Sequence, residues 1–164
     1  MPQGMDGKSL LQLIKGETKT HREKAFFNYN NGPVGPRFSS RAVTDGRFKL
    51  MWNLTPDNLF AVRTINGFDF GYEDTMKDRH VRAMYRSWLE KAGDDSAAAT
   101  AVQRFRKQPE FQLYELSQDP WERNNLAANP AYATQVRELK DSIQSWMQKQ
   151  GDTGFYDPEK KDQK

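Results

Sequence analysis

The sequence contains no cysteine at all. It therefore cannot form a disulfide, a thiolate metal site or a cysteine nucleophile. Long apolar runs are missing too, because no stretch approaches the roughly 18 residues that a membrane-spanning helix needs. Residues 1–16 lack the charged start, the apolar stretch and the cleavage site of a secretory signal. The chain is thus predicted to hold neither a transmembrane segment nor a signal peptide.

A strong excess of charge of one sign is also lacking. The 25 Lys and Arg residues exceed the 22 Asp and Glu residues by three, which favours anionic partners only weakly. Aromatic residues, in contrast, make up 12% of the 164 residues and fall in patterned segments, which excludes disorder throughout the chain. The length suits one domain with one core. We predict a folded α+β domain.

Four segments have the composition and the flanking turn residues of β-strands. They are Glu23–Tyr29, Phe38–Thr44, Arg47–Trp52 and Phe111–Leu116. The dipeptide Asp45-Gly46 joins the middle two, and its tolerance of positive φ predicts a hairpin closed by a type I′ turn. Phe48, Leu50 and Trp52 alternate along the second strand of this hairpin, so they are expected to face the core. The last strand is expected to rejoin the same sheet.

Three helices are predicted ahead of the last strand. They cover Ser9–Lys15, a stretch between Asp74 and Lys91, and a stretch that begins at Asp95 and ends before Pro109. Ser9 and Asp95 are suitable capping residues, and apolar residues recur at helical spacing in the middle helix. Residues 55–72, rich in turn formers, are predicted to form a long irregular connection.

The final helix has the clearest signals. Asn129 can cap it, Pro130 suits its first position and Gly151 closes it. Its apolar stripe consists of Tyr132, Val136, Leu139, Ile143, Trp146 and Met147. The spacing also fits a short coiled coil, but it lasts under three heptads, which favours packing against the chain's own sheet. The charged residues after Gly151 are expected to form a frayed tail.

Catalytic and metal-binding motifs are absent from the sequence. His21 and His80 are far apart, and neither has a second ligand at the spacing of a zinc site. The segment 32–36 is rich in Gly and Pro but has no phosphate-binding motif, and no Ser lies in a GxSxG elbow. The residues alone therefore supply no catalytic centre and no metal site.

Basic and aromatic residues alternate on the predicted hairpin. Arg37, Arg41, Arg47 and Lys49 lie among Phe38, Phe48 and Trp52. This pattern allows a stand-alone module that binds a polyanion, either a sulfated glycan or nucleic acid. A half-buried sheet with charged edges explains the same pattern more simply. A structural adaptor that offers the final helix to a partner is a third possibility, although stripes of this kind are more commonly buried within the molecule.

Several segments in order along the chain resemble the C-terminal region of formylglycine-dependent sulfatases, in the subgroup of heparan N-sulfatase and its bacterial relatives. They are Met5–Leu11, Arg41–Val43, Asp45–Leu50, Leu113–Leu116, Asp119–Glu122, Asn124–Ala127, Asn129-Pro130 and Trp146-Met147. The resemblance extends from about Met5 to Asp152 and is weakest in the insertion at 55–108.

The resemblance implies an α+β fold with an antiparallel sheet of about four strands, a long C-terminal helix on one face and a helical insertion. Residues 1–16 would be the segment in which the chain leaves the catalytic domain. Residues 17–150 would form the C-terminal subdomain, and residues 151–164 would be a flexible tail. The implied role is to support the catalytic domain and to line part of a cleft for sulfated carbohydrate. Neither nucleic acid nor a membrane is an expected partner, and a periplasmic or secreted location is implied.

The sequence departs from the family in its catalytic residues. In sulfatases the Cys or Ser of a [CS]-x-P-x-R motif is oxidised to formylglycine, which is the nucleophile, and this chain has no such motif. The family's calcium ligands lie in the catalytic domain, which has no counterpart here, so no cofactor is expected in this chain and the isolated chain is expected to be inactive. A start four residues before Met5 would fit an excised domain, a truncated gene model or half of a split gene.

Five residues are predicted to contact substrate, because the final helix should occupy one face of the sheet and leave loops and strand ends for recognition. They are His21 and Arg22 at the entrance of the first strand, Asn28 and Asn30 at its exit, and His80 in the insertion. Their cationic and amide groups suit sulfate and hydroxyl recognition.

Overall fold

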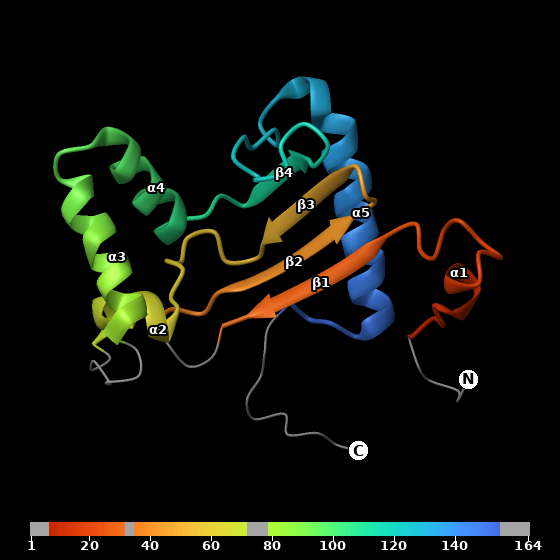
Figure 1. The fold of residues 1–164 in the computed structure, drawn as a ribbon, viewed down its shortest axis with the longest axis horizontal. Helices are drawn as coiled ribbons and strands as arrows, with labels where there is room; N and C mark the ends of the chain where they lie inside the picture. The colour runs from red at the N-terminus through yellow and green to blue at the C-terminus, as the bar shows by residue number, and fades with distance from the viewer. Residues whose placement is uncertain (1–6, 32–34, 72–78, 155–164) are drawn as a thin grey trace, which may run out of the picture.

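The computed structural model describes residues 7–31, 35–71 and 79–154, and its centre is one antiparallel sheet (Figure 1). The strands lie in the order β1, β2, β3, β4, and their bounds are Ala25–Asn30, Ser39–Thr44, Phe48–Asn53 and Phe111–Glu115. Each strand pairs with its neighbour in antiparallel register. The predicted α+β class and the return of the last strand to the hairpin's sheet are confirmed.

The turn between β2 and β3 differs from the prediction. The Asp45 amide donates to the Phe48 carbonyl over 3.2 Å, so the two central residues are Gly46 and Arg47. Gly46 has a φ of +91°, whereas Arg47 does not have a positive φ. A type I′ turn requires a positive φ at both central residues, so the predicted type I′ turn is wrong. The Asp45 carboxylate accepts the Arg47 and Phe48 amides and fixes this geometry.

The core lies between the sheet and the long helix α5, Ala133–Gln150. Its buried members come from three strands and the helix: Val43, Phe48, Leu50, Leu113, Leu139 and Ile143. Val136 and Met147 of the predicted stripe pack against this cluster, and so does Trp52 of β3. The final helix is therefore a core helix that packs on its own sheet, as the simpler interpretation predicted.

The start of this last helix is capped as predicted, with a difference in detail. The Asn129 side chain accepts the Ala131 amide at 3.0 Å, and the first turn is a 3₁₀ helix, η2, over Pro130–Tyr132. A 3₁₀ turn at a helix terminus is common. Gly151 ends α5 with a φ of +64°, the left-handed conformation that glycine adopts without steric cost.

The helical insertion contains two short helices that the sequence did not indicate. They are α2, Arg63–Asn66, and η1, Gly67–Phe70, and both lie in the segment predicted to be irregular. The buried Asn66 side chain accepts the Val62 amide and donates to the Phe60 carbonyl. Helices of one turn have too few residues for a periodic signal, which explains why this prediction was wrong.

The other helices occur where they were predicted, with different bounds. They are α1, Leu11–Ile14, then α3, Arg79–Ala92, and α4, Ser96–Arg106. The Asp95 side chain caps α4 by accepting the Ala97 and Ala98 amides. The beginning of the predicted helix at 74–78 and part of the loop at 32–36 lie outside the described residues, as do residues 155–164.

A row of aromatic rings joins the insertion to the sheet. The ring of Phe38, just before β2, lies 4.8 Å from that of Phe60. Phe60 lies 5.5 Å from Phe105 of α4, and Phe105 lies 5.4 Å from Tyr85 of α3. Edge-to-face and tilted contacts at these distances are favourable. The insertion therefore has a small aromatic core of its own that continues into the sheet.

Replacing a leucine of the main core should destabilise the fold strongly. Leu139 is 4% exposed, and Leu139→Ala should lower the free energy of unfolding by about 2–5 kcal/mol, because it opens a cavity in the core. The matched control is Leu11→Ala in α1, since Leu11 is 54% exposed and should change stability by less than about 0.5 kcal/mol. Urea denaturation of both variants measures this, and equal losses would contradict the assignment of the core.

Candidate functional site

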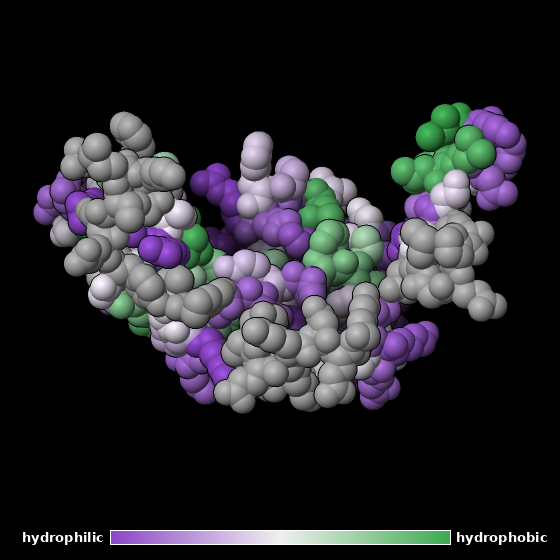
Figure 2. All heavy atoms as spheres, turned by 90° about the horizontal axis from the view of Figure 1, so that it is seen from below, coloured by the Kyte–Doolittle hydropathy of each residue, from purple (hydrophilic) through white to green (hydrophobic). Residues whose placement is uncertain are grey.

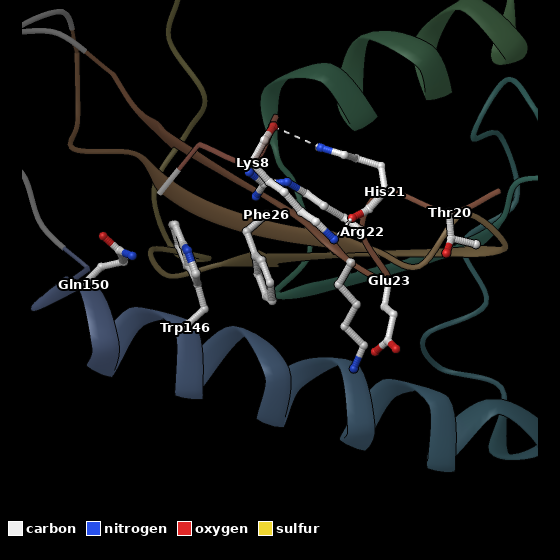
Figure 3. Close-up of a pocket in the computed structure, with 9 residues that line it drawn as sticks. Lys8, Thr20, His21, Arg22, Glu23, Phe26, Trp146 and Gln150 are labelled. Carbon is white, nitrogen blue, oxygen red and sulfur yellow. Dashed lines mark hydrogen bonds between the residues drawn. The ribbon is translucent and has the colours of Figure 1, made fainter. Parts of the chain in front are cut away.

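A hollow of about 770 Å³ opens where the chain enters β1, and we call it the entrance pocket (Figure 3). Its lining comes from three parts of the chain: the N-terminal segment, the approach to β1 and the end of α5. The lining residues are Lys8, Thr20, His21, Arg22, Glu23, Lys24, Phe26, Trp146 and Gln150. The structure thus brings together two of the five predicted substrate residues, His21 and Arg22.

His21 holds the N-terminal segment against the approach to β1. Its Nε2 lies 3.0 Å from the Lys8 carbonyl oxygen, and the Lys8 ammonium donates to the His21 carbonyl over 2.8 Å (Figure 3). Each residue therefore binds the backbone of the other. This pair gives His21 a positioning role in the pocket, because one ring nitrogen already has a backbone partner.

Positive charge predominates around the entrance pocket. Lys8, Arg22 and Lys24 line it, and Glu23 is its acidic residue. The Lys24 ammonium donates to the Ser142 hydroxyl of α5 over 2.7 Å, which holds this cation beside the helix. Arg22 is exposed to solvent, and a guanidinium can bind an oxyanion through two parallel hydrogen bonds. The pocket can therefore attract a sulfated or carboxylated ligand.

One wall of the entrance pocket is aromatic. The rings of Phe26 in β1 and Trp146 in α5 stack with centroids 5.4 Å apart and an angle of 6° between their planes (Figure 3). Trp146 is partly exposed, so part of its ring remains accessible at the pocket. Pockets for small molecules typically combine aromatic walls with a few polar groups. Sequence reasoning assigned Trp146 to the core stripe and did not connect it with His21 or Arg22.

The other three predicted residues lie elsewhere. Asn28 is exposed in the middle of β1, and Asn30 is at its far end. A strand of six residues spans roughly 17–20 Å, so Asn30 is remote from the entrance pocket. The Asn30 side chain instead accepts the Arg41 guanidinium at 2.9 Å. His80 belongs to the first turn of α3, and its side chain lies outside the described part of the chain.

Arg41 is the centre of a buried polar cluster that the sequence did not reveal. Its side chain is 1% exposed and binds both carboxylate oxygens of Asp152, through Nε at 2.5 Å and Nη2 at 2.8 Å. Its Nη1 donates to Asn30 and to the Ser40 carbonyl. Asp152 was expected in a flexible tail, but this pair ties it to the sheet. Arg41 and Val43 are two residues apart and share the inward face of β2. This alternation was the signal in the sequence from which the burial of Arg41 could have been predicted.

The hydrogen bond from Arg41 also lowers the pKa of Asp152 below its ordinary value of 3.8. A depressed carboxyl pKa stabilises the fold at every pH above the unfolded value. That contribution decreases as the pH falls through the folded pKa, because the carboxylate then becomes protonated. The pair between Asp152, just beyond the end of α5, and Arg41 of β2 therefore weakens as the pH falls below the ordinary carboxyl pKa.

Three of the four basic residues predicted on the hairpin are held in ion pairs. Arg41 is buried against Asp152, the Arg47 guanidinium binds Glu115 at 2.8 Å, and the Lys49 ammonium binds Glu122 at 2.8 Å. A polyanion would have to compete with each of these carboxylates. The alternative of a stand-alone polyanion-binding module is therefore not favoured.

Metal binding has no support within the described residues. In the ranges 7–31, 35–71 and 79–154, no three His, Asp or Glu side chains gather closely enough to hold a metal ion. Among the helices described there, none has the length and apolar character to cross a bilayer.

Comparison with curated proteins relates the chain to sulfatases, although no protein-family model matches it. An ulvan-active sulfatase of Formosa agariphila is 26% identical over 151 residues, which cover 92% of this chain and 26% of the relative. The N-sulphoglucosamine sulphohydrolase of Homo sapiens is 25% identical over 87% of this chain and 26% of its own length. The chain thus spans about a quarter of the length of these relatives.

Solved structures share the fold. A 2-O GAG sulfatase matches 97% of this chain and 24% of its own, with a TM-score of 0.56 and 16% identity. The protein BT4656, solved in complex with its substrate D-glucosamine-2-N,6-O-disulfate, matches 99% of this chain and 23% of its own, with a TM-score of 0.52 and 17% identity. The fold and the sequence together define a sulfatase homologue. The resemblance to the N-sulfoglucosamine sulfohydrolase subgroup and its bacterial relatives is confirmed.

Breaking the pair between Arg41 and Asp152 should destabilise the protein. Asp152→Asn leaves the buried guanidinium without its counter-charge, and the free energy of unfolding at pH 7 should fall by roughly 3 kcal/mol. The variant should also lose the part of the acid dependence that Asp152 contributes below its unfolded pKa of 3.8. Urea denaturation from pH 2 to pH 7 measures both effects.

The matched control is Glu115→Gln, which breaks the pair with Arg47. Because the Arg47 side chain is 68% exposed, this change should cost less than about 1 kcal/mol. Equal losses in the two variants would mean that burial does not strengthen the Asp152 pair.

Proposed function

We propose that the chain is the non-catalytic part of a sulfatase that acts on sulfated sugars. The observation that carries this proposal is the unequal coverage: over 90% of the chain matches only about a quarter of an ulvan-active sulfatase. The chain has no cysteine and no [CS]-x-P-x-R motif, so the nucleophile must come from the other part of the enzyme. In this proposal, calcium and formylglycine belong to that catalytic domain.

Within such an enzyme the chain supports the catalytic domain and lines part of the substrate cleft. The entrance pocket is the part of the chain best suited to the second task, because it combines the exposed Arg22 and nearby lysines with the Phe26 and Trp146 wall. Arg22 would bind a sulfate or carboxylate group of the sugar, while His21 would fix the segment that carries it. The sulfated sugar bound to BT4656 has the matching chemistry. A periplasmic or secreted location belongs to the same proposal.

The isolated chain should not hydrolyse sulfate esters or sulfamates. Its residues can bind and orient a sugar, but no group in the sequence can form the covalent sulfate intermediate that formylglycine supports in sulfatases. Sulfate release from an aryl sulfate and from D-glucosamine-2-N,6-O-disulfate, with and without calcium, measures this. Turnover by the pure chain would disprove the proposal that the nucleophile lies in the other part of the enzyme.

Substitution of Arg22 should weaken substrate binding in a complete enzyme. A chimera provides that enzyme: the matched segment of the ulvan-active sulfatase is replaced by this chain. Arg22→Ala should raise KM roughly tenfold, because a hydrogen bond to a charged group is lost, while kcat and the thermal midpoint stay unchanged. Arg137→Ala, at an exposed position of α5 outside the pocket, is the control. An unchanged KM, or a loss of folding, would make Arg22 a structural residue.

A further inference from the structure

The sheet has a second face that α5 does not cover. In Figure 1 the strands lie in front of α5, so this open face is turned toward the viewer. Phe26 of β1 stacks on Trp146 of α5, and alternation along the strand therefore directs Phe27 and Tyr29 to the open face. Phe27 is 52% exposed and Tyr29 is 42% exposed. Phe27 thus lies largely in solvent, and Tyr29 is partly exposed although its ring packs against two aromatic rings of neighbouring segments. The sheet is therefore uncovered at its edge strand β1.

The open face is a shallow apolar groove. A hollow of about 460 Å³ runs across β1, β2 and β3, and its lining includes Phe27, Tyr29, Ala42 and Met51. The outward face of a solvated antiparallel sheet normally carries polar residues. Here β1 has aromatic residues on both faces, which is the pattern of a strand that is buried on both sides. The composition of β1 therefore indicates that another surface covers the open face.

The electrostatics of the groove exclude a polyanionic occupant. Its charged lining residues, Lys49 and Glu122, bind each other at 2.8 Å, and their charges cancel. Glu122 holds this position with a φ of +54°, a conformation that non-glycine residues adopt rarely. A neutral groove with an aromatic floor suits the apolar surface of a folded protein.

The shape of the molecule argues against a second copy as the occupant. Figure 2 shows that the molecule is hollowed between its helical end, with α3 and α4, and the end that carries α1. Two hollowed surfaces placed face to face would touch at their rims and leave their floors apart. A two-fold contact requires one surface that is complementary to itself, so the groove needs a convex partner of another kind.

The apolar side chains of α1 extend the same surface. Leu10 is 51% exposed, Leu11 is 54% exposed and Ile14 is 77% exposed. A hydrophobic cluster rises at one end of the hollow in Figure 2, at the end of the molecule that carries α1 in Figure 1. An α1 of four residues with no buried residue does not stabilise the chain by itself, so its leucines are also available to a partner that lies in the hollow.

We infer that the open face of the sheet, together with α1, is the surface that docks the sulfatase catalytic domain. This inference rests on the proposed function, and it identifies the docking surface, which the proposed function did not specify. In the relatives, the matched segment is about a quarter of a single chain, so the remaining three quarters is a tethered partner. Tethering gives effective concentrations in the millimolar range, at which a modest apolar groove is sufficient for stable docking.

The lack of native cysteine makes the inference testable by thiol labelling. Phe27→Cys places a thiol on the open face, and Gln144→Cys places one at an exposed position of α5, on the opposite side of the sheet. Each variant is prepared as the isolated chain and in the chimera with the ulvan-active sulfatase. Labelling rates are measured with a maleimide reagent against the chimera that lacks an introduced cysteine.

The thiol of Phe27→Cys should react quickly in the isolated chain. In the chimera its labelling rate should be lower by roughly tenfold or more, because docking removes the thiol from solvent. The thiol of Gln144→Cys should react at the same rate in both. Equal reactivity of Phe27→Cys in both forms overturns the inference. Protection that rises with the concentration of the isolated chain also overturns it, in favour of a second copy.

Failure of this inference and failure of the proposed function give different results. A chimera that hydrolyses sulfate while Phe27→Cys stays reactive keeps the sulfatase role and rejects the docking face. A chimera with a protected thiol and no sulfatase activity gives the opposite result. Should the chimera not fold, the two cysteines are introduced at the aligned positions of the unmodified ulvan-active sulfatase, where the same rates decide the question.

Discussion

A sheet of four strands has two faces, and this chain has one long helix with which to cover them. Helix α5 buries Leu139 and Ile143 against one face and forms the main core there. The helices of the insertion pack among themselves and beside the sheet, around Phe60, Phe105 and Tyr85. The second face consequently stays open over β1, where Phe27 is 52% exposed, whereas Tyr114 of β4 on the same face is buried. The asymmetry of the fold has this one origin.

The buried pair between Arg41 and Asp152 determines where α5 ends relative to the sheet. Gly151 stops the helix with a left-handed turn, and the next residue reaches the centre of β2. A buried pair of this kind is weak evidence for net stability, because desolvation offsets much of the attraction. Its geometric effect is clearer: the bidentate bond permits one register of the chain end, which also places Trp146 over Phe26.

Local signals in the sequence were sufficient for most of the fold. Asp95, Asn129 and Gly151 mark helix ends through their own backbone chemistry, and the alternation in β3 identifies its buried face. Interactions between distant residues were not accessible in the same way. The link from Arg41 to Asp152 spans 111 residues, and no local pattern reports it. The same limit applies to the candidate site, where His21 and Arg22 were identified but their neighbour Trp146 was not.

Strand β1 connects the two surfaces to which we assign a function. Its first part contributes Phe26 to the entrance pocket, while the adjacent Phe27 faces the open groove on the other side of the sheet. A partner that docks on the groove therefore contacts the residue next to the pocket wall, and Arg22 precedes it by only five positions. A subdomain without a nucleophile can affect catalysis only through position and charge. Because β1 is hydrogen-bonded to β2 along its length, it can fix the position of the pocket relative to the docked domain.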